Sequence, residues 1–412
     1  MRRTFLIGAV VITAAALLAA CGETGGGGSG GSTIKVGVLT SLSGSYASGF
    51  TTTEKGVKAR FDLENAAGGV NGKKLEYVMA DDANGADVAV NKLVQQEKVF
   101  GILSVSPLFV RGATAAARSG VPVFGSGFDG APQWLDKNVK NFFDIAGAAG
   151  YGAVNTNFGA FAKSQGVTRM AGVGNSGSPS SAGAATGVVM SAEHAGIPRG
   201  YLSTTLAPGS TDVGPAVLGI KESGSDGLYL PVIPATAFAL IAGLAQAGVP
   251  MKAIILATGY GNDLLESPPA VQAGQGVDFM SGAAPVELKT PGTLRFQDAL
   301  QRYAGVTGTP TFAEYQGWLT ADAFIAGLKA AGPNPTTSGY VQKFRNSDWD
   351  TAGLLGTPEN HTLNFGDYGG AGAKNGPNNC FYVVKLKGKQ FEPIPGASPV
   401  CGELVPGLST GF

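Results

Sequence analysis

Charged residues and histidines are scarce in this chain of 412 residues. Lys and Arg together number 29, Asp and Glu also number 29, and charged residues make up 14% of the chain. This sparse, balanced charge provides no basic face for nucleic acid or for an anionic membrane surface. The only histidines are His194 and His361, and neither lies near another candidate ligand at the spacing of a zinc site. We therefore expect no nucleic-acid partner and no metal.

Cysteine is also rare, and one of the three cysteines ends an apolar leader. Residues 1–21 contain two arginines, an apolar run from 5 to 18, and small residues before Cys21. This pattern is typical of a secretory signal and is too short for a permanent membrane helix. Residues 18–21, LAAC, resemble the bacterial lipobox, in which the cysteine becomes the lipidated first residue. An ordinary signal peptide with an incidental cysteine is the alternative.

The next residues, 22–32, are almost entirely glycine and serine, which predicts a flexible tether. With Cys21 assigned to lipid, Cys380 and Cys401 remain. In an exported protein these two favour a disulfide, which would close a loop of roughly 20 residues and stabilise the fold by about 3 kcal/mol. Free thiols remain the alternative. We expect an exported protein held by lipid at the outer face of the bacterial cytoplasmic membrane.

Glycine is abundant, with 65 residues, and the first part of the chain alternates strand and helix patterns. The first apolar, β-branched run leads into a Ser- and Gly-rich loop at 41–49 and then into a helix. Such βα units predict a parallel sheet, with ligands at the carboxyl edge of its strands. We expect strands at 34–39, 74–80, 100–105 and 121–124 and helices through 57–63, 86–97 and 110–118, followed by a crossover at 142–146.

The same alternation then begins again. We expect helices at 153–163, 182–194, 211–222 and 235–247, strands at 169–173, 201–206, 226–230 and 253–257, a return crossing at 279–283, helices at 293–303 and 312–331, and a hairpin at 381–390. The repetition predicts an α/β protein of two similar Rossmann-like lobes with parallel sheets and a multi-strand hinge. The first lobe comprises 33–146 and 283–357, the second comprises 147–282 and 358–412, and a ligand cleft lies between them.

Three segments resemble a known family. They are IKVGVLTSLSG at 34–44, the stretch 56–82 with GGVNGKKL and a strand ending in DD, and VPVFGSGF at 121–128. They are similar to periplasmic solute-binding proteins of the branched-chain amino acid and amide type, which serve ABC importers. The resemblance is good over 34–147 and weaker but collinear to about residue 345. It implies the type I periplasmic binding protein fold, like that of the Leu/Ile/Val-binding proteins.

The resemblance also implies ligand-binding positions. The family holds a ligand carboxylate or carbonyl with the loops after its third and fourth strands, and its first loop contributes packing. In the first lobe these loops supply Tyr46, Phe50, Ser104, Val105, Ser106, Ser126, Gly127, Phe128 and Asp129. In the second lobe the corresponding loops supply Ser176, Ser178, Pro231 and Tyr260. Ordinary packing is the alternative role for each aromatic residue.

One departure from the family pattern bears on the ligand. Amino-acid binders place a Glu against the ligand ammonium in a late loop, which here reads Ala-Thr-Gly-Tyr-Gly at 257–261. An ammonium without a carboxylate partner in a closed cleft would carry a desolvation cost of several kcal/mol. Asp129 could substitute, but it lies beside the other pole of the expected ligand. We therefore favour an organic acid, aromatic acid or amide over a standard amino acid.

Two motifs typical of enzymes occur by chance. GVGNSG at 172–177 fits a dinucleotide fingerprint, but nicotinamide cofactors are scarce outside the cytoplasmic membrane and a glycine-rich chain produces such matches easily. GGSGG at 27–31 lies in the tether. We expect no enzyme activity and no cofactor. An extracellular hydrolase using Ser126 or Ser176 would be the contrary outcome.

The sequence thus predicts a monomeric, lipid-anchored solute-binding protein that captures a small organic ligand and delivers it to the permease subunits of an ABC importer. The alternative is a ligand-sensing lipoprotein of the same fold that signals to a membrane partner. A permease and an ATPase encoded beside the chain would favour transport, whereas a neighbouring kinase would favour sensing.

Overall fold

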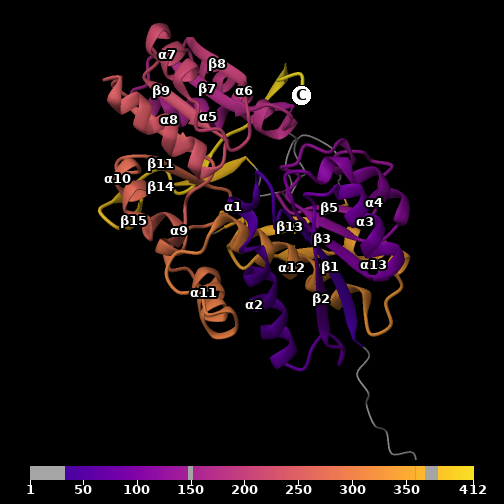
Figure 1. The fold of residues 1–412 in the computed structure, drawn as a ribbon. Coiled ribbons are helices and arrows are strands. Elements are labelled where there is room, and N and C mark those ends of the chain that lie inside the picture. The colour runs from indigo at the N-terminus through magenta and orange to yellow at the C-terminus, as the bar shows by residue number, and fades with distance from the viewer. Residues whose placement is uncertain (1–32, 147–151, 358, 367–378) are drawn as a thin grey trace, which may run out of the picture. The chain divides into compact units, whose positions relative to one another are not determined.

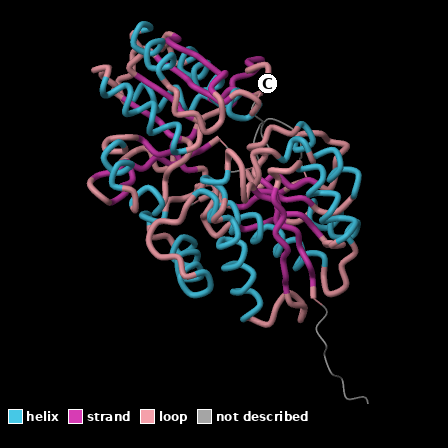
Figure 2. The backbone as a smooth tube through the Cα atoms, in the orientation of Figure 1, coloured by secondary structure: helices cyan, strands magenta, loops and turns pink. Residues whose placement is uncertain are grey.

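A computed structural model describes residues 33–146, 152–357, 359–366 and 379–412. The expected signal peptide, tether and lipidation site at Cys21 lie outside these residues. Within them, two sheets form the cores of two lobes, and Figure 2 shows helices along the sides of both sheets. No helix in the described ranges is long and apolar enough to cross a membrane.

The first lobe is built on a fully parallel sheet in the order β2-β1-β3-β4-β5, of which β1, β2, β3 and β5 are labelled in Figure 1. Its strands are β1 (Ile34–Thr40), β2 (Leu75–Asp81), β3 (Gly101–Val105), β4 (Val123–Gly125) and β5 (Phe142–Asp144). Neighbouring residues of a strand point to opposite faces. On β3, Leu103 packs into one hydrophobic core and Ile102 into another, and Phe124 and Val123 do the same on β4. The sheet is therefore buried on both faces.

Helices from distant parts of the chain cover these faces. One face is covered by α2 (Thr53–Ala66) and α12 (Phe312–Ala331), with α11 (Pro291–Ala304) against α2 and α13 (Thr337–Arg345) against α12. The other is covered by α3 (Ala86–Asn91), which continues as a π-helix (Lys92–Gln96), and α4 (Ala113–Ser119). Thr311 and Glu314 form a capping box that fixes the start of α12 beside the sheet edge.

The second lobe has a mixed sheet in the order β15-β14-β11-β10-β9-β7-β8. Its parallel strands are β7 (Met170–Asn175), β8 (Arg199–Leu206), β9 (Gly227–Leu230), β10 (Ala253–Leu256) and β11 (Asp278–Ser281), and the antiparallel hairpin is β14 (Cys380–Lys387) and β15 (Gln390–Pro393). Helices α5 (Thr156–Ser164) and α6 (Pro179–His194) pack together, as do α7 (Gly214–Ser223), α8 (Pro234–Gln246) and the shorter α10 (Pro268–Ala273).

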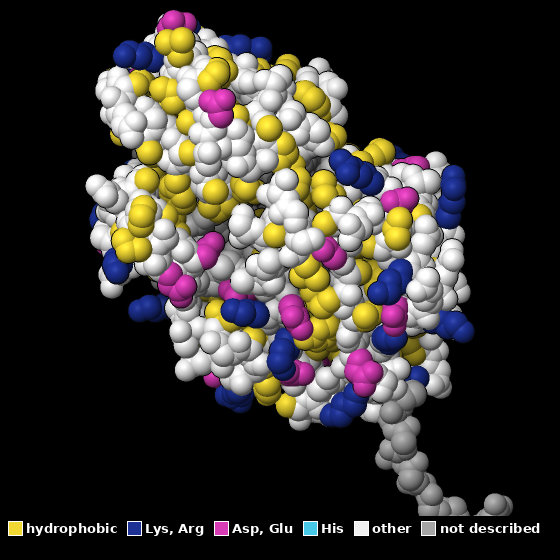
Figure 3. All heavy atoms as spheres, viewed as in Figure 1, with side chains coloured by type: hydrophobic (Ala, Val, Ile, Leu, Met, Phe, Trp, Pro, Cys, Tyr) yellow, Lys and Arg dark blue, Asp and Glu magenta, His cyan; other side chains and the backbone are white. Residues whose placement is uncertain are grey.

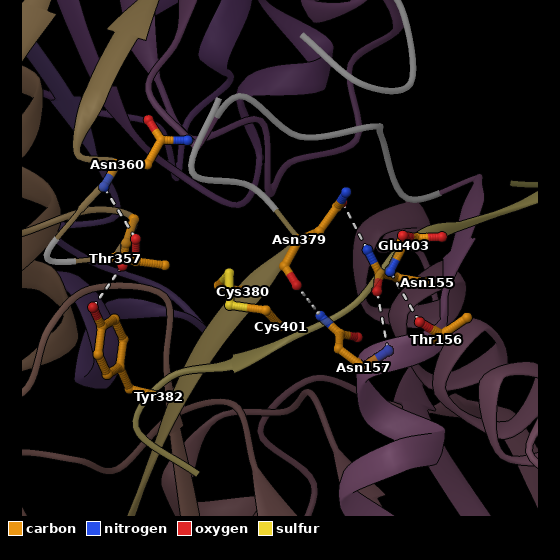
Figure 4. The surroundings of a disulfide bond; sticks show 11 residues. Asn155, Thr156, Asn157, Thr357, Asn360, Asn379, Cys380, Tyr382, Cys401 and Glu403 are labelled. Atoms are coloured by element: carbon orange, nitrogen blue, oxygen red, sulfur yellow. Dashed lines mark hydrogen bonds between the residues drawn. A yellow bond between two sulfur atoms is a disulfide. The ribbon is translucent and has the colours of Figure 1, made fainter. Parts of the chain in front are cut away.

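The C-terminal segment is bound to the start of the second lobe. β17 (Leu404–Ser409) pairs with β6 (Ala153–Asn155), and β16 (Val400–Cys401) pairs with β14. The Cys380–Cys401 disulfide joins β14 to β16, as Figure 4 shows. Beside it, the Asn155 amide donates to the Asn379 side chain at 2.7 Å. The disulfide and these hydrogen bonds hold three separate segments of the chain together.

Some predicted elements differ from those observed. Residues 142–144 are not a crossover but β5, because their alternating Phe side chains pack on both faces of the first sheet. Residues 153–155 are strand and not helix, since β17 pairs with them and Asn155 caps α5. Residues 278–281 are strand β11, which hydrogen-bonds to β10 and β14. Sequence analysis also missed α13 and the small antiparallel pair β12 (Asp348–Asp350) and β13 (Thr362–Asn364).

Candidate functional site

A cavity of about 190 Å³ lies where loops after the strands of the two sheets meet. The carboxyl edge of parallel strands is the usual place for ligands in such sheets. The first lobe contributes Tyr46, Phe50, Pro107, Phe128 and Phe312. The second-lobe lining includes the polar residues Asn175, Ser178, Ser180, Ser181 and Thr258 and the phenol ring of Tyr229. Figure 3 shows hydrophobic side chains gathered along the level where the two lobes meet.

The first-lobe wall is aromatic. Phe50 ends the short helix α1 (Ala47–Phe50), and its ring stacks on Phe128 at a centroid distance of 5.7 Å. Phe312, the first residue of α12, lies edge-on to both rings, 6.0 Å from Phe50 and 5.6 Å from Phe128. Ile233 of the second lobe packs into the same cluster. Three rings with offset and edge-on contacts make a rigid apolar surface.

Tyr46 precedes α1 and also lines the cavity. Burial raises the pKa of Tyr46, while the charge of Arg111 and the side chain of Ser178 act in the opposite direction. Because Ser178 belongs to the second lobe, Tyr46 marks a point where the lobes approach each other. Its phenol is un-ionised at neutral pH and can donate a hydrogen bond.

The second-lobe wall is the N-terminal end of α6. The Ser178 side chain caps the helix by accepting from the backbone N–H of Ser181 at 3.3 Å, and its hydroxyl lies 3.1 Å from that of Ser180. Ser181 donates to the carbonyl of Pro231 at 2.6 Å and accepts from the backbone N–H of Asn175 at 2.8 Å. Ser181 thereby fixes the ends of β7 and β9 relative to the helix. This end of a helix carries partial positive charge that favours anionic or carbonyl groups.

The cavity lining described by the structure contains no Asp, Glu, Lys, Arg or His. Asn175 is buried, and its Oδ1 atom has no hydrogen-bond partner in the described structure. A buried polar atom without a partner carries a cost that a ligand donor could remove. The cavity therefore offers a largely aromatic first-lobe side and an uncharged second-lobe side, on which polar groups lie among apolar residues and the ring of Tyr229.

The structure brings five of the predicted ligand contacts to this cavity: Tyr46, Phe50, Phe128, Ser178 and Pro231. Ser176 is exposed and lines a separate, adjoining cavity. These six residues come from distant parts of the sequence and lie in one region of the structure. That they contact a ligand remains a prediction.

The predicted first-lobe serines do not line the cavity. Ser106 donates its hydroxyl to Asp82 and accepts from the backbone N–H of Leu108 at 3.1 Å. Ser41 donates to the same Asp82 oxygen at 2.8 Å. The hydroxyls of Ser104 and Ser126 are buried without a partner in the described structure. Ser106 is thus occupied within its own lobe, whereas the other two have unused hydrogen-bonding capacity.

Asp129 also has an internal role. Its Oδ1 accepts from the backbone N–H of Ala131 at 2.9 Å, and its Oδ2 accepts from the indole N–H of Trp134 at 2.8 Å. Burial raises the pKa of Asp129 to about 7, although these hydrogen bonds oppose the rise. Gly127 provides the turn before it, with φ of 61° and a carbonyl that accepts from the Gly130 N–H. The carboxylate holds this loop in place and has no free oxygen for a ligand.

Val105 and Tyr260 are core residues. Val105 is fully buried in the cluster below Tyr46 and Phe50. Tyr260 donates its hydroxyl to Glu287 at 2.5 Å and accepts from the backbone N–H of Val286 at 2.9 Å. Its ring packs against Phe391 at a centroid distance of 5.0 Å. Because both ring and hydroxyl are occupied, the structure places Tyr260 outside the cavity lining.

Sequence analysis missed several lining residues. Asn175 and Ser180 flank the positions chosen in their loop, and the position of Asn175 at the end of a buried strand could have identified it. Thr258 lies two residues from the predicted Tyr260 and bonds to the carbonyl of Val232 at 2.7 Å. Phe312 carried no local signal, because only the packing of α12 on the first sheet brings it to the cavity.

The dinucleotide-like glycines have a packing explanation. A side chain on Gly172 would lie 2.7 Å from the carbonyl oxygen of Ala185, and one on Gly174 would lie 2.7 Å from that of Ser181. Both positions therefore need glycine so that β7 can approach α6 closely. This close approach accounts for the motif without a bound nucleotide.

Comparisons with known proteins agree with this architecture. A model of the periplasmic binding protein family matches residues 33–390. No curated protein sequence matches the chain. Among solved structures, a solute-binding protein of an ABC transporter from R. palustris in complex with benzoate is 16% identical, with a TM-score of 0.67 over 91% of this chain and 98% of that one.

Two further solved structures are similar. LivJ, the branched-chain amino acid transporter substrate-binding protein from Streptococcus pneumoniae, in complex with isoleucine, is 18% identical, with a TM-score of 0.67 over 90% of this chain and 99% of that one. A fatty acid ABC transporter substrate-binding protein from Thermomonospora curvata is 16% identical, with a TM-score of 0.68 over 92% and 94% of the chains. At these identities the likeness concerns the two-lobe fold.

Proposed function

Since this chain belongs to the periplasmic binding protein family, we propose that it captures a small organic acid or amide between its two lobes and delivers it to an ABC importer. The observation that supports this most strongly is the composition of the cavity. Most of the rings, those of Tyr46, Phe50, Phe128 and Phe312, come from the first lobe. The second lobe supplies hydroxyls, an amide, a helix N-terminus and the ring of Tyr229, and the described lining contains no charged side chain.

The ligand class follows from that composition. The ring surface of Phe50, Phe128 and Phe312 suits an apolar or aromatic body. Asn175 and the hydroxyls at the start of α6 suit a carbonyl, hydroxyl, amide or carboxylate. An ammonium group would find no carboxylate in the described lining and would lose hydration without compensation. The site therefore favours an aromatic or short apolar acid or amide over a standard amino acid.

Capture would work by closure of the two lobes. A ligand that touches both walls gains its full set of contacts only when the walls are near each other, so it favours the closed arrangement by its difference in affinity for the two states. Ser181 keeps the second wall in one arrangement, and the three-ring cluster does the same for the first. Release to a permease would require the reverse movement.

Isothermal titration of the purified full-length protein tests the proposed class. The probes are benzoate, benzamide, hexanoate, leucine and isoleucine. We expect benzoate, benzamide or hexanoate to bind at least tenfold more tightly than either amino acid, because only the amino acids bring an unpaired ammonium. Tight binding of leucine or isoleucine, with weak binding of the other three, would contradict the proposal.

Lipid attachment at Cys21 is a separate part of the proposal, supported by the LAAC motif and the glycine-rich residues that follow. We expect labelled palmitate to be incorporated into the expressed chain and membrane fractions to contain it. The variant Cys21→Ser should lose the label and appear in the soluble fraction. Equal labelling of both would contradict a lipid anchor at this residue.

A further inference from the structure

A second cavity adjoins the aromatic one. It has a volume of about 320 Å³, and Tyr46 lines both. Its polar lining includes Ser43 and Ser45 of the first lobe, Ser176 of the second, and the side chain of Arg111. We call this second cavity the vestibule. Arg111 is the one charged residue in the described lining of either cavity.

Arg111 is held at a fixed place in the fold. It ends the short 3-10 turn Phe109–Arg111, whose first residue is fully buried. The ring of Phe109 packs against Trp134 and Phe142 at centroid distances of 5.6 Å and 5.7 Å. The backbone that carries Arg111 is therefore anchored in the core of the first lobe, while the residue itself is exposed.

The hydrogen bonds of the neighbouring carboxylates Asp81 and Asp82 go to groups other than Arg111. Asp81 accepts from the backbone N–H of Leu42 at 3.0 Å and from the hydroxyl of Ser43 at 2.6 Å. Asp82 is buried, and its Oδ2 accepts from Ser41 and Ser106, whereas its Oδ1 has no partner in the described structure. In the described part of the chain, no carboxylate forms an ion pair with Arg111, whose charge acts on Tyr46. The guanidinium is thus available to an anion that enters the vestibule.

We propose that the ligand is an elongated carboxylic acid whose carboxylate lies in the vestibule against Arg111, while its apolar body passes Tyr46 into the aromatic cavity. This inference rests on the proposed function and specifies its ligand. The aromatic cavity is uncharged and would hold the apolar body of such a molecule. The adjoining vestibule contains the guanidinium of Arg111 and would hold its carboxylate. Arginine binds carboxylates through two parallel hydrogen bonds, and in a partly hydrated vestibule the carboxylate keeps some water. The hydroxyls at the start of α6 remain for a second, neutral polar group.

The dependence of binding affinity on the length and the charge of the ligand tests this assignment. The probes are benzoate, phenylacetate, 3-phenylpropanoate and 4-phenylbutanoate, each with its primary amide, titrated calorimetrically into the full-length protein. We expect affinity for the acids to rise with chain length to an optimum beyond benzoate. R111Q should weaken the best acid about tenfold and leave its amide within twofold, and R111K should recover part of the loss.

The matched control is R118Q. Arg118 is an exposed arginine near the end of α4 in the same lobe and lines neither cavity. R118Q should leave every affinity within twofold of wild type. Weaker binding in R111Q would then come from the loss of a local contact and not from the loss of one positive charge. Equal affinity of wild type and R111Q for all acids, or equal losses for acids and amides, would overturn the role of Arg111 while leaving the proposed function in place. If none of the acids or amides binds the wild type, the proposed function falls as well.

Discussion

Polar residues at the strand ends of the two lobes are used differently. In the first lobe, both oxygens of Asp129 and one oxygen of Asp82 bond to groups of their own lobe, and neither residue lines the cavity, although the other Asp82 oxygen has no partner in the described structure. In the second lobe, Asn175 and Ser180 line the cavity, and the Asn175 oxygen has no partner in the described structure. Polar residues near strand ends thus stabilise loops in the first lobe, whereas those of the second lobe line the cavity.

Loop construction explains the difference. The loop after β4 turns through Gly127 and Gly130 before the 3-10 turn at Trp134, and Asp129 supplies the acceptors that hold it. The loop after β7 enters α6 after only three residues, so the cap Ser178 is enough to order it. A short loop leaves more of its polar groups free to face the cavity.

The largest expected effect concerns Asp129→Asn and the pH dependence of stability. Burial raises the pKa of Asp129 from 3.8 to about 7, so the folded state holds this proton where the unfolded state has released it. The stabilisation is present below pH 4 and is lost as the pH rises through 7, by about 4 kcal/mol at about 1.4 kcal/mol per pKa unit. We expect the unfolding free energy of the variant, relative to wild type, to increase by about that amount from pH 4 to pH 8 in urea titrations.

Two further measurements complete this test. Asp298→Asn removes a carboxylate that is 59% exposed, and its difference from wild type should stay within about 0.5 kcal/mol at both pH values. Ligand affinity of Asp129→Asn should equal that of wild type, since both Asp129 oxygens are bonded within the loop. If the stability difference between Asp129→Asn and wild type did not change with pH, or if Asp129→Asn lost ligand affinity, Asp129 would not have the purely structural role in the first lobe that we assign to it.

Phe50→Ala tests the aromatic contribution of the first lobe. Phe50 is 7% exposed and contacts two other rings. Its truncation should lower the unfolding free energy by about 3 kcal/mol and weaken an aromatic ligand by more than tenfold, because both packing and ligand surface are lost. Leu294→Ala, at a position that is 50% exposed, should change neither quantity by much. If Phe50→Ala bound ligand with the affinity of wild type, the ring of Phe50 would not be part of the ligand site.

Local patterns in the sequence predicted much of the fold because its core strands are continuous apolar runs. β3, β7 and β9 are buried along their length and β1 is buried except at Lys35, and all four were predicted within two residues at each end. β12 and β13 escaped prediction, since each has three residues and is defined only by its partner. Long-range pairing, as between β6 and β17, leaves no comparable local pattern.

The site was predictable in position but less so in detail. The family resemblance indicated the loops at the strand ends, and five of the residues chosen there line the cavity. It did not show which side chains turn inward. Tyr260 was predicted to offer a ligand apolar or stacking surface, with ordinary packing as the alternative, and its hydrogen bond to Glu287 holds it in the core. Such choices depend on tertiary contacts, which spacing along the chain does not encode.

Asn175→Ala tests whether the Asn175 side chain of the second lobe contacts the ligand. The substitution removes a buried oxygen without a partner, so stability should change by less than about 0.5 kcal/mol, whereas loss of a ligand hydrogen bond should weaken binding about tenfold. The matched control is Asn141→Ala in the first lobe, where the amide donates to the carbonyls of Ala116 and Val121. This variant should lose about 2 kcal/mol of unfolding free energy and keep its ligand affinity. If the two variants changed stability and ligand affinity by the same amounts, Asn175 could not be assigned to ligand binding and Asn141 to stability.

The smallest effects are expected for Ser104→Ala and Ser126→Ala. Each removes a buried hydroxyl that has no partner in the described structure, so unfolding free energy should stay constant or rise by up to about 1 kcal/mol. Neither side chain lines the cavity, and ligand affinity should stay within twofold in calorimetric titrations. A tenfold loss of affinity in either variant would mean that lobe closure brings ligand to these hydroxyls. In that case the first lobe would supply polar contacts as well as rings, and the contrast between the lobes would hold only in the arrangement that this structure describes.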